Sequence, residues 1–253
     1  MTGDFTTALL LTAAAGLSTT IGSALGLLVQ RPGRRFLGFT LGFSAGVMTL
    51  VSFVELLPGS VEVLGFGQAH LAFFAGMTVY FLIDLLVPHE YLGQHDHPGG
   101  ERSGELMRVG LLVALGIGIH NFPEGMATFV GALQDTKLGV AIAVAIAIHN
   151  IPEGLAVSAP IYAATGSRGK AFLWSAFSGL SEPVGALLAG LVLWPFLGPV
   201  MMGWTLAVVA GIMVAISLDE LIPAAKSFGS DHLPIVGVIV GMAVMALSLH
   251  LLR

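Results

Sequence analysis

The chain has 253 residues, of which 55% are hydrophobic and only 10% are charged, with a formal net charge of -5. Soluble domains carry about 25% charged residues, so this composition excludes a soluble enzyme, a nucleic-acid-binding protein and a disordered chain. The absence of cysteine excludes disulfides, thiolate metal sites and thiol catalysis. What remains is a polytopic protein of the lipid bilayer, with residues 1–253 forming one integrated membrane domain.

Eight stretches of the sequence are apolar over about 20 residues, the length that a helix needs to cross a bilayer. Helices are predicted because the stretches are too long and continuous for the strands of a membrane barrel. The longest polar connection covers about residues 89–107, between the third and fourth stretches. The eight predicted spans are 5–30, 35–57, 68–88, 108–133, 138–163, 170–194, 201–224 and 233–251.

The basic residues predict the orientation of these spans. Eight of the ten Lys and Arg residues follow the first, third, fifth and seventh spans. Because Lys and Arg concentrate in cytoplasmic loops, we expect these loops, including 89–107, to be cytoplasmic. Both termini are then expected on the extracytoplasmic side of the cell (inner) membrane.

Seven acidic residues fall within the spans or at their ends. A charged side chain at the centre of a bilayer costs about 3 kcal/mol on insertion scales, and no Lys or Arg lies deep in a span. The counter-ions are therefore expected to come from outside the chain, as metal cations or protons. The seven acids are Glu55, Asp84, Glu124, Glu153, Glu182, Asp219 and Glu220.

Two short motifs occur twice. H-N-F-P-E-G at 120–125 returns as H-N-I-P-E-G at 149–154, in the fourth and fifth spans. E-L-L-P at 55–58 returns as E-L-I-P at 220–223, at the expected ends of the second and seventh spans. Since the second and seventh spans run in opposite directions, the sequence predicts an all-α fold with an inverted repeat. Spans 1–3 and 6–8 form its halves around a central pair, spans 4 and 5.

The H-N-x-P-E spacing favours a metal site in mid-membrane. His and Glu four positions apart share one helix face, and the proline frees a backbone carbonyl and is expected to kink the helix. A mixture of imidazole and carboxylate suits Zn²⁺, Fe²⁺, Mn²⁺ or Co²⁺. Glu182, which precedes Pro183, is a candidate to close this site, or else a satisfied buried carboxyl. A role in helix packing alone would explain the proline and glycine of each motif. It would not explain why His and Glu are present four positions apart in both motifs.

At these motifs the sequence resembles the ZIP family of divalent-metal transporters, most closely its bacterial ZupT type. The resemblance implies import of zinc, and also iron, manganese, cobalt or cadmium, as substrate and without a resident cofactor. It implies a homodimer and an elevator-like motion of spans 1, 4, 5 and 6. It also implies a binuclear centre with a first site at His120, Glu124, His149, Glu153 and Met48, and a second at Asn121, Glu124, Asn150, Glu153 and Glu182.

Other functions remain open on the residues alone. An intramembrane metalloenzyme would use the same His and Glu centre, although no H-E-x-x-H motif is present. Transport of protons or alkali ions through the acids is a third hypothesis. The histidines argue against alkali ions, because hard cations prefer sites made of oxygen ligands alone. The transporter, and not an enzyme, is the preferred interpretation.

Several weaker features allow two interpretations each. Met48 is either a soft ligand or a core residue. Glu55, Asp219 and Glu220 either line the metal pathway or are interfacial acids in water, and Asp84 is expected to be interfacial. His95 and His97 form either a weak metal-receiving pair or part of a solvated loop.

Overall fold

The computed structural model describes residues 4–29, 33–86, 100–193, 198–227 and 232–252, and its regular elements there are all helical. The α-helices are α1 (Phe5–Leu27), α2 (Arg34–Val51), α3 (Leu57–Leu64), α4 (Phe66–Leu86), α5 (Gly100–Gln134), α6 (Thr136–Thr165), α7 (Arg168–Leu188), α8 (Pro199–Ile216), α9 (Ile222–Ser227) and α10 (Leu233–Leu252). The five-residue π-helical segments η1 (Ser52–Leu56) and η5 (Ser217–Leu221) join α2 to α3 and α8 to α9, and another, η3 (Ala189–Leu193), follows α7.

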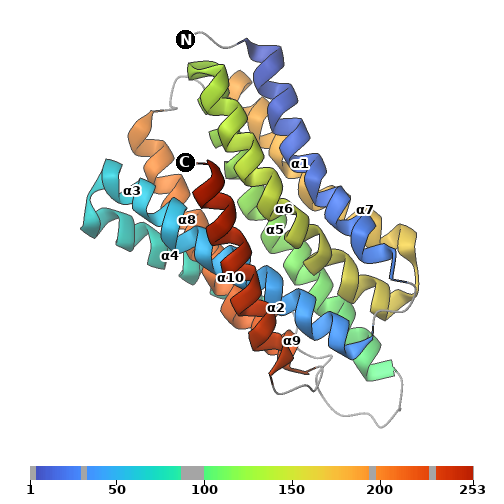
Figure 1. The fold of residues 1–253 in the computed structure, drawn as a ribbon. Helices are drawn as coiled ribbons and strands as arrows, with labels where there is room; N and C mark the ends of the chain where they lie inside the picture. The colour runs from blue at the N-terminus through green and yellow to red at the C-terminus, as the bar shows by residue number, and fades with distance from the viewer. Residues whose placement is uncertain (1–3, 30–32, 87–99, 194–197, 228–231, 253) are drawn as a thin grey trace.

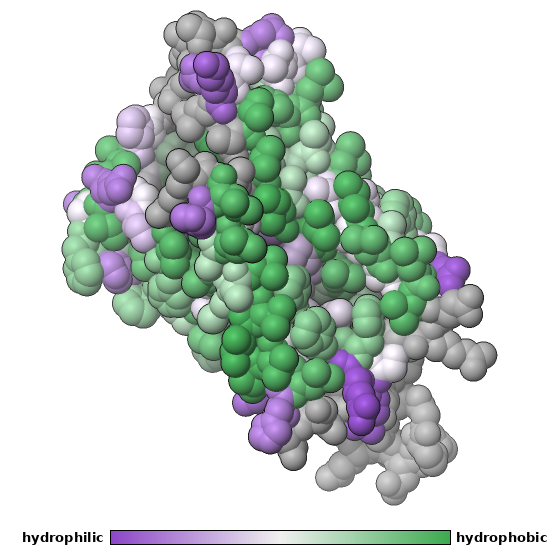
Figure 2. Space-filling view, in the orientation of Figure 1, coloured by the Kyte–Doolittle hydropathy of each residue, from purple (hydrophilic) through white to green (hydrophobic). Residues whose placement is uncertain are grey.

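Within the described residues, eight helical stretches are long and apolar enough to cross a membrane, as predicted. Large apolar side chains face outward along them, for example Leu10 and Leu251, which are 65% and 74% exposed. Figure 2 shows hydrophobic residues over the middle of the visible face and hydrophilic ones mainly toward its ends. This distribution suits a chain whose solvent is lipid, so the protein is a multi-pass membrane protein.

The second and seventh spans are longer than predicted, because neither ends at its E-L-x-P motif. Each continues through a π-helical segment, η1 or η5, into a further helix that ends at Leu64 or Ser227. The amide of Leu57 donates to the carbonyl of Ser52, five residues back. The wider turn accommodates Pro58, whose ring would collide with a carbonyl in a regular α-helix. The prediction that the spans end at these motifs was wrong for this reason.

The helices pack as two units. The motif unit contains α1, α5, α6 and α7, and the flanking unit contains α2, α3, α4, α8, α9 and α10. Figure 1 shows α2 and α10 side by side, and α5 and α6 between them and the pair α1 and α7. The units meet mainly where α2 packs on α6 and α8 packs on α5. The H-N-x-P-E motifs thus lie on the two helices that face the flanking unit.

An inverted repeat relates the helices of the motif unit. Gly22 of α1 packs so closely on α6 that an added Cβ would collide with the carbonyl of Ile151. Gly185 of α7 packs in the same way on the carbonyl of Phe122 in α5. Phe122 and Ile151 occupy the same position in the two motifs. The contact of α1 with α6 is therefore repeated by α7 with α5.

The same relation holds in the flanking unit. Gly46 of α2 packs against the carbonyl of Val238 in α10, and Gly211 of α8 packs against the carbonyl of Phe73 in α4. Both glycines follow an alanine and stand two residues before a methionine. Small residues permit such backbone contact between membrane helices. Spans 1, 2 and 3 thus correspond to spans 6, 7 and 8, with α5 and α6 exchanged, which confirms the predicted inverted repeat.

Candidate metal-binding site

The two H-N-x-P-E motifs meet at the centre of the motif unit. Nε2 of His120 on α5 lies 3.0 Å from Oε1 of Glu153 on α6. Nε2 of His149 on α6 lies 3.1 Å from Oε2 of Glu124 on α5. All four side chains are at most 3% exposed. The repeat therefore produces two equivalent pairs, each joining the histidine of one helix to the glutamate of the other.

Both asparagines of the motifs point toward the outer helices of the motif unit. Nδ2 of Asn150 donates to the carbonyl of Ala15 in α1, at 2.9 Å, and also to Oε1 of Glu182 in α7. Nδ2 of Asn121 donates to the carbonyl of Ser178 in α7, at 3.3 Å. The two backbone contacts are equivalent in the inverted repeat. Glu182 thus joins the centre through Asn150.

The centre holds buried oxygens without a hydrogen-bond partner in the described part of the chain. They include Oε1 of Glu124, Oε2 of Glu153 and Oε2 of Glu182, together with the amide oxygens of Asn121 and Asn150. An unsatisfied buried polar atom costs about 1–3 kcal/mol, and more if it is charged. Acceptor oxygens gathered around two imidazoles fit a cation, which would satisfy them together.

The inverted repeat is broken at one position beside the centre. Gly125 of α5 packs against the backbone of Glu182 in α7, and Gly154 of α6 packs in the same way against Thr19 of α1. Thr19 therefore occupies the position on α1 that Glu182 occupies on α7. Both side chains are fully buried. The carboxylate is present on one side of the centre and a neutral hydroxyl on the other, so the centre has unequal halves.

Met48, the predicted soft ligand, is fully buried in the apolar cluster between the two units. One turn earlier on α2, Oγ of Ser44 donates to the carbonyl of Pro152 in α6, at 2.7 Å. This bond fixes α2 against the second motif. Pro123 and Pro152 themselves lie inside α5 and α6, which remain helical on both sides of each proline.

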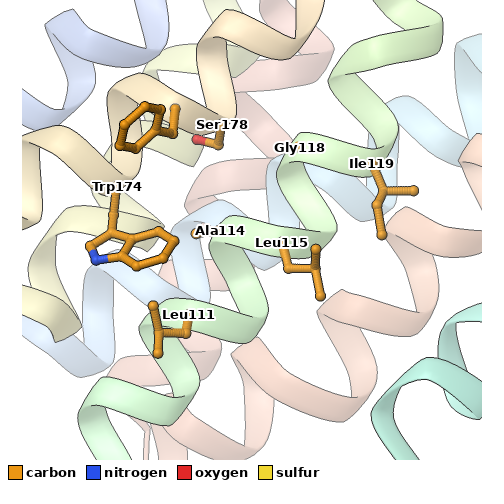
Figure 3. Close-up of a pocket in the computed structure, with 8 residues that line it drawn as sticks. Leu111, Ala114, Leu115, Gly118, Ile119, Trp174 and Ser178 are labelled. Carbon is orange, nitrogen blue, oxygen red and sulfur yellow. The ribbon is translucent and has the colours of Figure 1, made fainter. Parts of the chain in front are cut away.

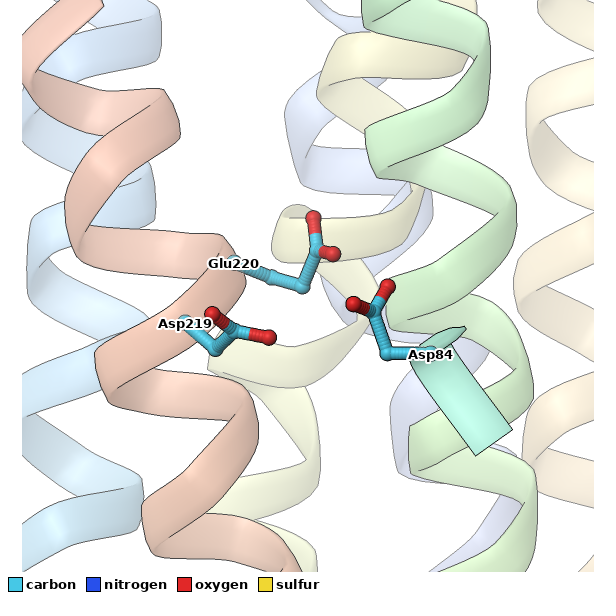
Figure 4. Close-up of side chains that lie close together, drawn as sticks. All are labelled: Asp84, Asp219 and Glu220. Carbon is cyan, nitrogen blue, oxygen red and sulfur yellow. The ribbon is translucent and has the colours of Figure 1, made fainter. Parts of the chain in front are cut away.

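A second group of acids lies away from the centre. Asp84 at the end of α4 faces Asp219 and Glu220 of η5 (Figure 4), and one oxygen of each lies within 4.8 Å of the others. Asp84 and Glu220 are only 6% and 7% exposed. Asp84 lies near the end of its helix but is not exposed to water, and Nη2 of Arg108 on α5 pairs with its Oδ1 at 3.3 Å. Sequence reasoning did not bring this group together because its members come from two spans that are far apart in the sequence.

Glu55, the remaining predicted pathway residue, belongs to neither of these groups. Glu55 lies on η1, in the position that corresponds to Glu220, and its side chain is exposed. His95 and His97 lie outside the described residues. The pathway interpretation of Glu55 therefore depends on its place in the repeat.

A groove of about 430 Å³ opens between α5 and α7 (Figure 3). Leu111, Leu115, Trp174 and Phe177 contribute to its apolar lining, and Ser178 reaches it from α7. Leu115, Trp174 and Phe177 are among the exposed apolar side chains. The groove offers no metal-binding group, so the candidate chemistry remains with the buried His and Glu pairs.

Comparison with known proteins agrees with this arrangement. A family model described as ZIP Zinc transporter matches residues 89–249, which include both motifs. The chain belongs to the ZIP family. It is 56% identical to the zinc transporter ZupT of Chlorobium phaeovibrioides, over 98% of this chain and 99% of the relative. It is 52% identical to ZupT of Corynebacterium efficiens, over 95% of both chains, and 49% identical to ZupT of Streptococcus mutans, over 97% of both.

Membership of the ZIP family decides between the open classes of function. The chain is a transporter and not an enzyme, so an intramembrane metalloenzyme is not favoured. The family moves its metal as a substrate, which agrees with the prediction that no resident cofactor is needed.

Proposed function

We propose that this ZIP protein imports divalent transition-metal ions, zinc foremost, into the cytoplasm. The main support for this proposal is the pair of buried His–Glu contacts between α5 and α6, which lie beside acceptor oxygens without a partner in the described residues. Relatives that share about half of the residues over almost the whole chain bear the name zinc transporter. Iron, manganese, cobalt and cadmium are proposed as further substrates, since imidazole and carboxylate ligands accept them.

The metal would bind at a binuclear centre. In the first site His120, His149, Glu124 and Glu153 are the ligands, with Met48 as a thioether that the flanking unit contributes. Each His–Glu hydrogen bond of the metal-free state would open, so that the imidazole nitrogen and the carboxylate oxygen both face the ion. The second site would use Glu182 with the two asparagines and the bridging glutamates.

Transport would follow from a movement of the motif unit against the flanking unit. Inside each unit, glycines bring helix backbones into direct contact, as at Gly22 and Gly46. Between the two units the contacts are made by side chains: a Cβ at Gly116 of α5 would meet the side chains of Ile216 and Tyr80 in the flanking unit. Side chains can change rotamers as packed helices slide, whereas interlocked backbones cannot. The contacts therefore support an elevator-like displacement of α1, α5, α6 and α7.

The charged groups suggest the two ends of the pathway. Asp84, Asp219 and Glu220 gather at the end where α4 stops and α5 starts, next to residues 87–99. The positive-inside rule makes this the cytoplasmic end. We therefore propose these acids as the exit, Glu55 as part of the entrance, and both termini outside the inner membrane. Residues 1–253 would form a single transport domain that assembles as a homodimer.

Uptake into proteoliposomes tests the proposal. Wild-type protein is expected to give saturable uptake of Zn²⁺, and of Fe²⁺, Mn²⁺ and Cd²⁺ in an order that the same assay determines. Glu124→Gln/Glu153→Gln should abolish uptake while the protein still assembles in the membrane. Glu62→Gln, at an exposed glutamate of α3, is the matched control and should transport normally. Normal uptake by the double variant would refute the proposal.

A further inference from the structure

The ion pair between Arg108 and Asp84 joins the two units of the protein. Arg108 belongs to α5 of the motif unit, and Asp84 belongs to α4 of the flanking unit. Their side chains are 15% and 9% exposed, and Nη2 lies 3.3 Å from Oδ1. A charge-assisted contact that is largely shielded from water is stronger than an exposed one. Movement of the motif unit along the flanking unit would have to break it.

Asp84 also belongs to the group of three acids that was proposed above as the exit. An oxygen of its carboxylate lies within 4.8 Å of oxygens from Asp219 and Glu220 (Figure 4). The guanidinium of Arg108 therefore binds a carboxylate that a divalent cation in this group would also need. A guanidinium and a metal ion compete for the same carboxylate, because their like charges repel each other at this distance.

In the part of the chain that the structure describes, the equivalent positions of the repeat do not form such a group. In the inverted repeat, Leu249 of α10 corresponds to Asp84, and Val54 of η1 corresponds to Asp219. Lys137 of α6 occupies the position of Arg108, and its side chain is exposed. The glycine contacts of the two halves are equivalent, but among the described residues the acid group with its largely shielded arginine is found at one end. If the ion pair between Arg108 and Asp84 served helix packing alone, we would expect an equivalent ion pair at both ends of the repeat.

We propose that Arg108 is a tethered counter-ion that competes with the transported metal for Asp84. In the metal-free protein the guanidinium offsets the charge of Asp84 within the acid group and holds the two units together. A divalent ion that arrives from the centre displaces it, which loosens the contact between the units at that end. Return of Arg108 to Asp84 expels the ion toward the cytoplasm. By linkage, the metal weakens the Arg108 contact by the same factor by which Arg108 weakens metal binding.

This inference rests on the proposed function, because it treats the acid group as part of the metal pathway, and its test is independent of the central site. Zn²⁺ binding is measured by calorimetry on the full chain carrying Glu124→Gln/Glu153→Gln, which removes the two carboxylates that the proposed central sites share. In that background Arg108→Gln is expected to tighten Zn²⁺ binding roughly ten-fold, as expected for loss of one charge-assisted competitor. Adding Asp84→Asn should abolish the tightened binding.

Two matched variants make the result specific. Arg108→Lys keeps the charge and should bind Zn²⁺ close to the parent value. Arg168→Gln removes an exposed arginine of α7 that lies over the ring of Tyr162, and should also leave binding unchanged. Unchanged, weaker or undetectable Zn²⁺ binding in Arg108→Gln would overturn the inference, since it would give Arg108 a structural role alone.

A distance measurement tests the coupling to movement. The chain has no cysteine, so spin labels can be placed at Lys170→Cys in α7 and Lys226→Cys in α9, both exposed. In the otherwise wild-type chain, Zn²⁺ should shift the distance distribution between the two units. Arg108→Gln without metal should reproduce that shift. A metal-free distribution in Arg108→Gln that matches the metal-free wild type would contradict a role for Arg108 in holding the units.

Discussion

His120 lies one helical turn from Glu124, but its Nε2 contacts Oε1 of Glu153 on the neighbouring helix, at 3.0 Å. The equivalent contact of His149 with Glu124 is 3.1 Å long. The i to i+4 spacing within each motif therefore places His and Glu on one face, and the neighbouring helix supplies the partner. This cross-helix arrangement makes the two motifs one centre and leads to the first prediction.

His120 and Glu153 should act as a unit in transport. Each of His120→Ala and Glu153→Ala is expected to lower the kcat/KM of Zn²⁺ uptake at least roughly ten-fold, and the double variant should be little worse than the more damaged single variant. Residues that share one interaction are non-additive, unlike distant ones. The check is a double-mutant cycle in proteoliposomes, and strictly additive losses would show that the two side chains act separately.

Glu182 should determine the occupancy of the second site. Glu182→Gln is expected to reduce bound zinc from two ions per chain to about one, because it removes the carboxylate that breaks the inverted repeat. Elemental analysis of purified protein after equilibrium dialysis provides the count. Thr19→Val, at the equivalent position on α1, serves as the control and should retain both ions. Two ions on Glu182→Gln would remove this residue from the second site.

Gly46 should be intolerant of any large side chain. A Cβ at this position would collide with the carbonyl of Val238, a backbone atom that cannot move away cheaply. Overpacking costs about 1–3 kcal/mol or more, so Gly46→Leu should fail to give a monodisperse peak in size-exclusion chromatography. Gly59→Leu is the matched comparison, since nothing lies within 4 Å of its added Cβ. Equal behaviour of the two variants would contradict the interlocked packing of α2 and α10.

The proposed orientation can be read from single cysteines in this cysteine-free chain. Lys137→Cys, at the start of α6, should react with a membrane-impermeant maleimide in intact cells. Lys170→Cys, at the start of α7, should react only after the inner membrane is made permeable. Both side chains are exposed, so the membrane alone controls their labelling. The reverse pattern would place the termini in the cytoplasm.

Much of the fold was predictable because its determinants are local. Apolar runs of span length predicted eight membrane helices, and the double H-N-x-P-E-G motif predicted the central pair of helices. The repeated E-L-x-P motif at Glu55 and Glu220 predicts the correspondence of the second and seventh spans, but not that both helices continue beyond it. The π-helical segments that accommodate Pro58 and Pro223 depend on a backbone adjustment that periodicity does not reveal.

The contacts between spans were less predictable. Periodicity places His120 and Glu124 on one face, but cannot say which residue of α6 completes the pair. Asp84 and Arg108 lie 24 positions apart on either side of a long connection, and nothing in their local sequence links them. The position of Met48 was not predictable either. Its helix is held against α6 by the hydrogen bond that Ser44 donates to the carbonyl of Pro152, and no sequence pattern indicated that bond.

The most direct test of the central claim is zinc X-ray absorption spectroscopy on the purified full chain. Zinc at the His–Glu centre should show a first coordination shell dominated by imidazole nitrogen and carboxylate oxygen at about 2.0–2.2 Å. That imidazole signature should disappear in Glu124→Gln/Glu153→Gln, while Glu62→Gln retains it. A spectrum without histidine ligands, or one that the double variant leaves unchanged, would show that zinc is bound elsewhere and would contradict the proposed centre.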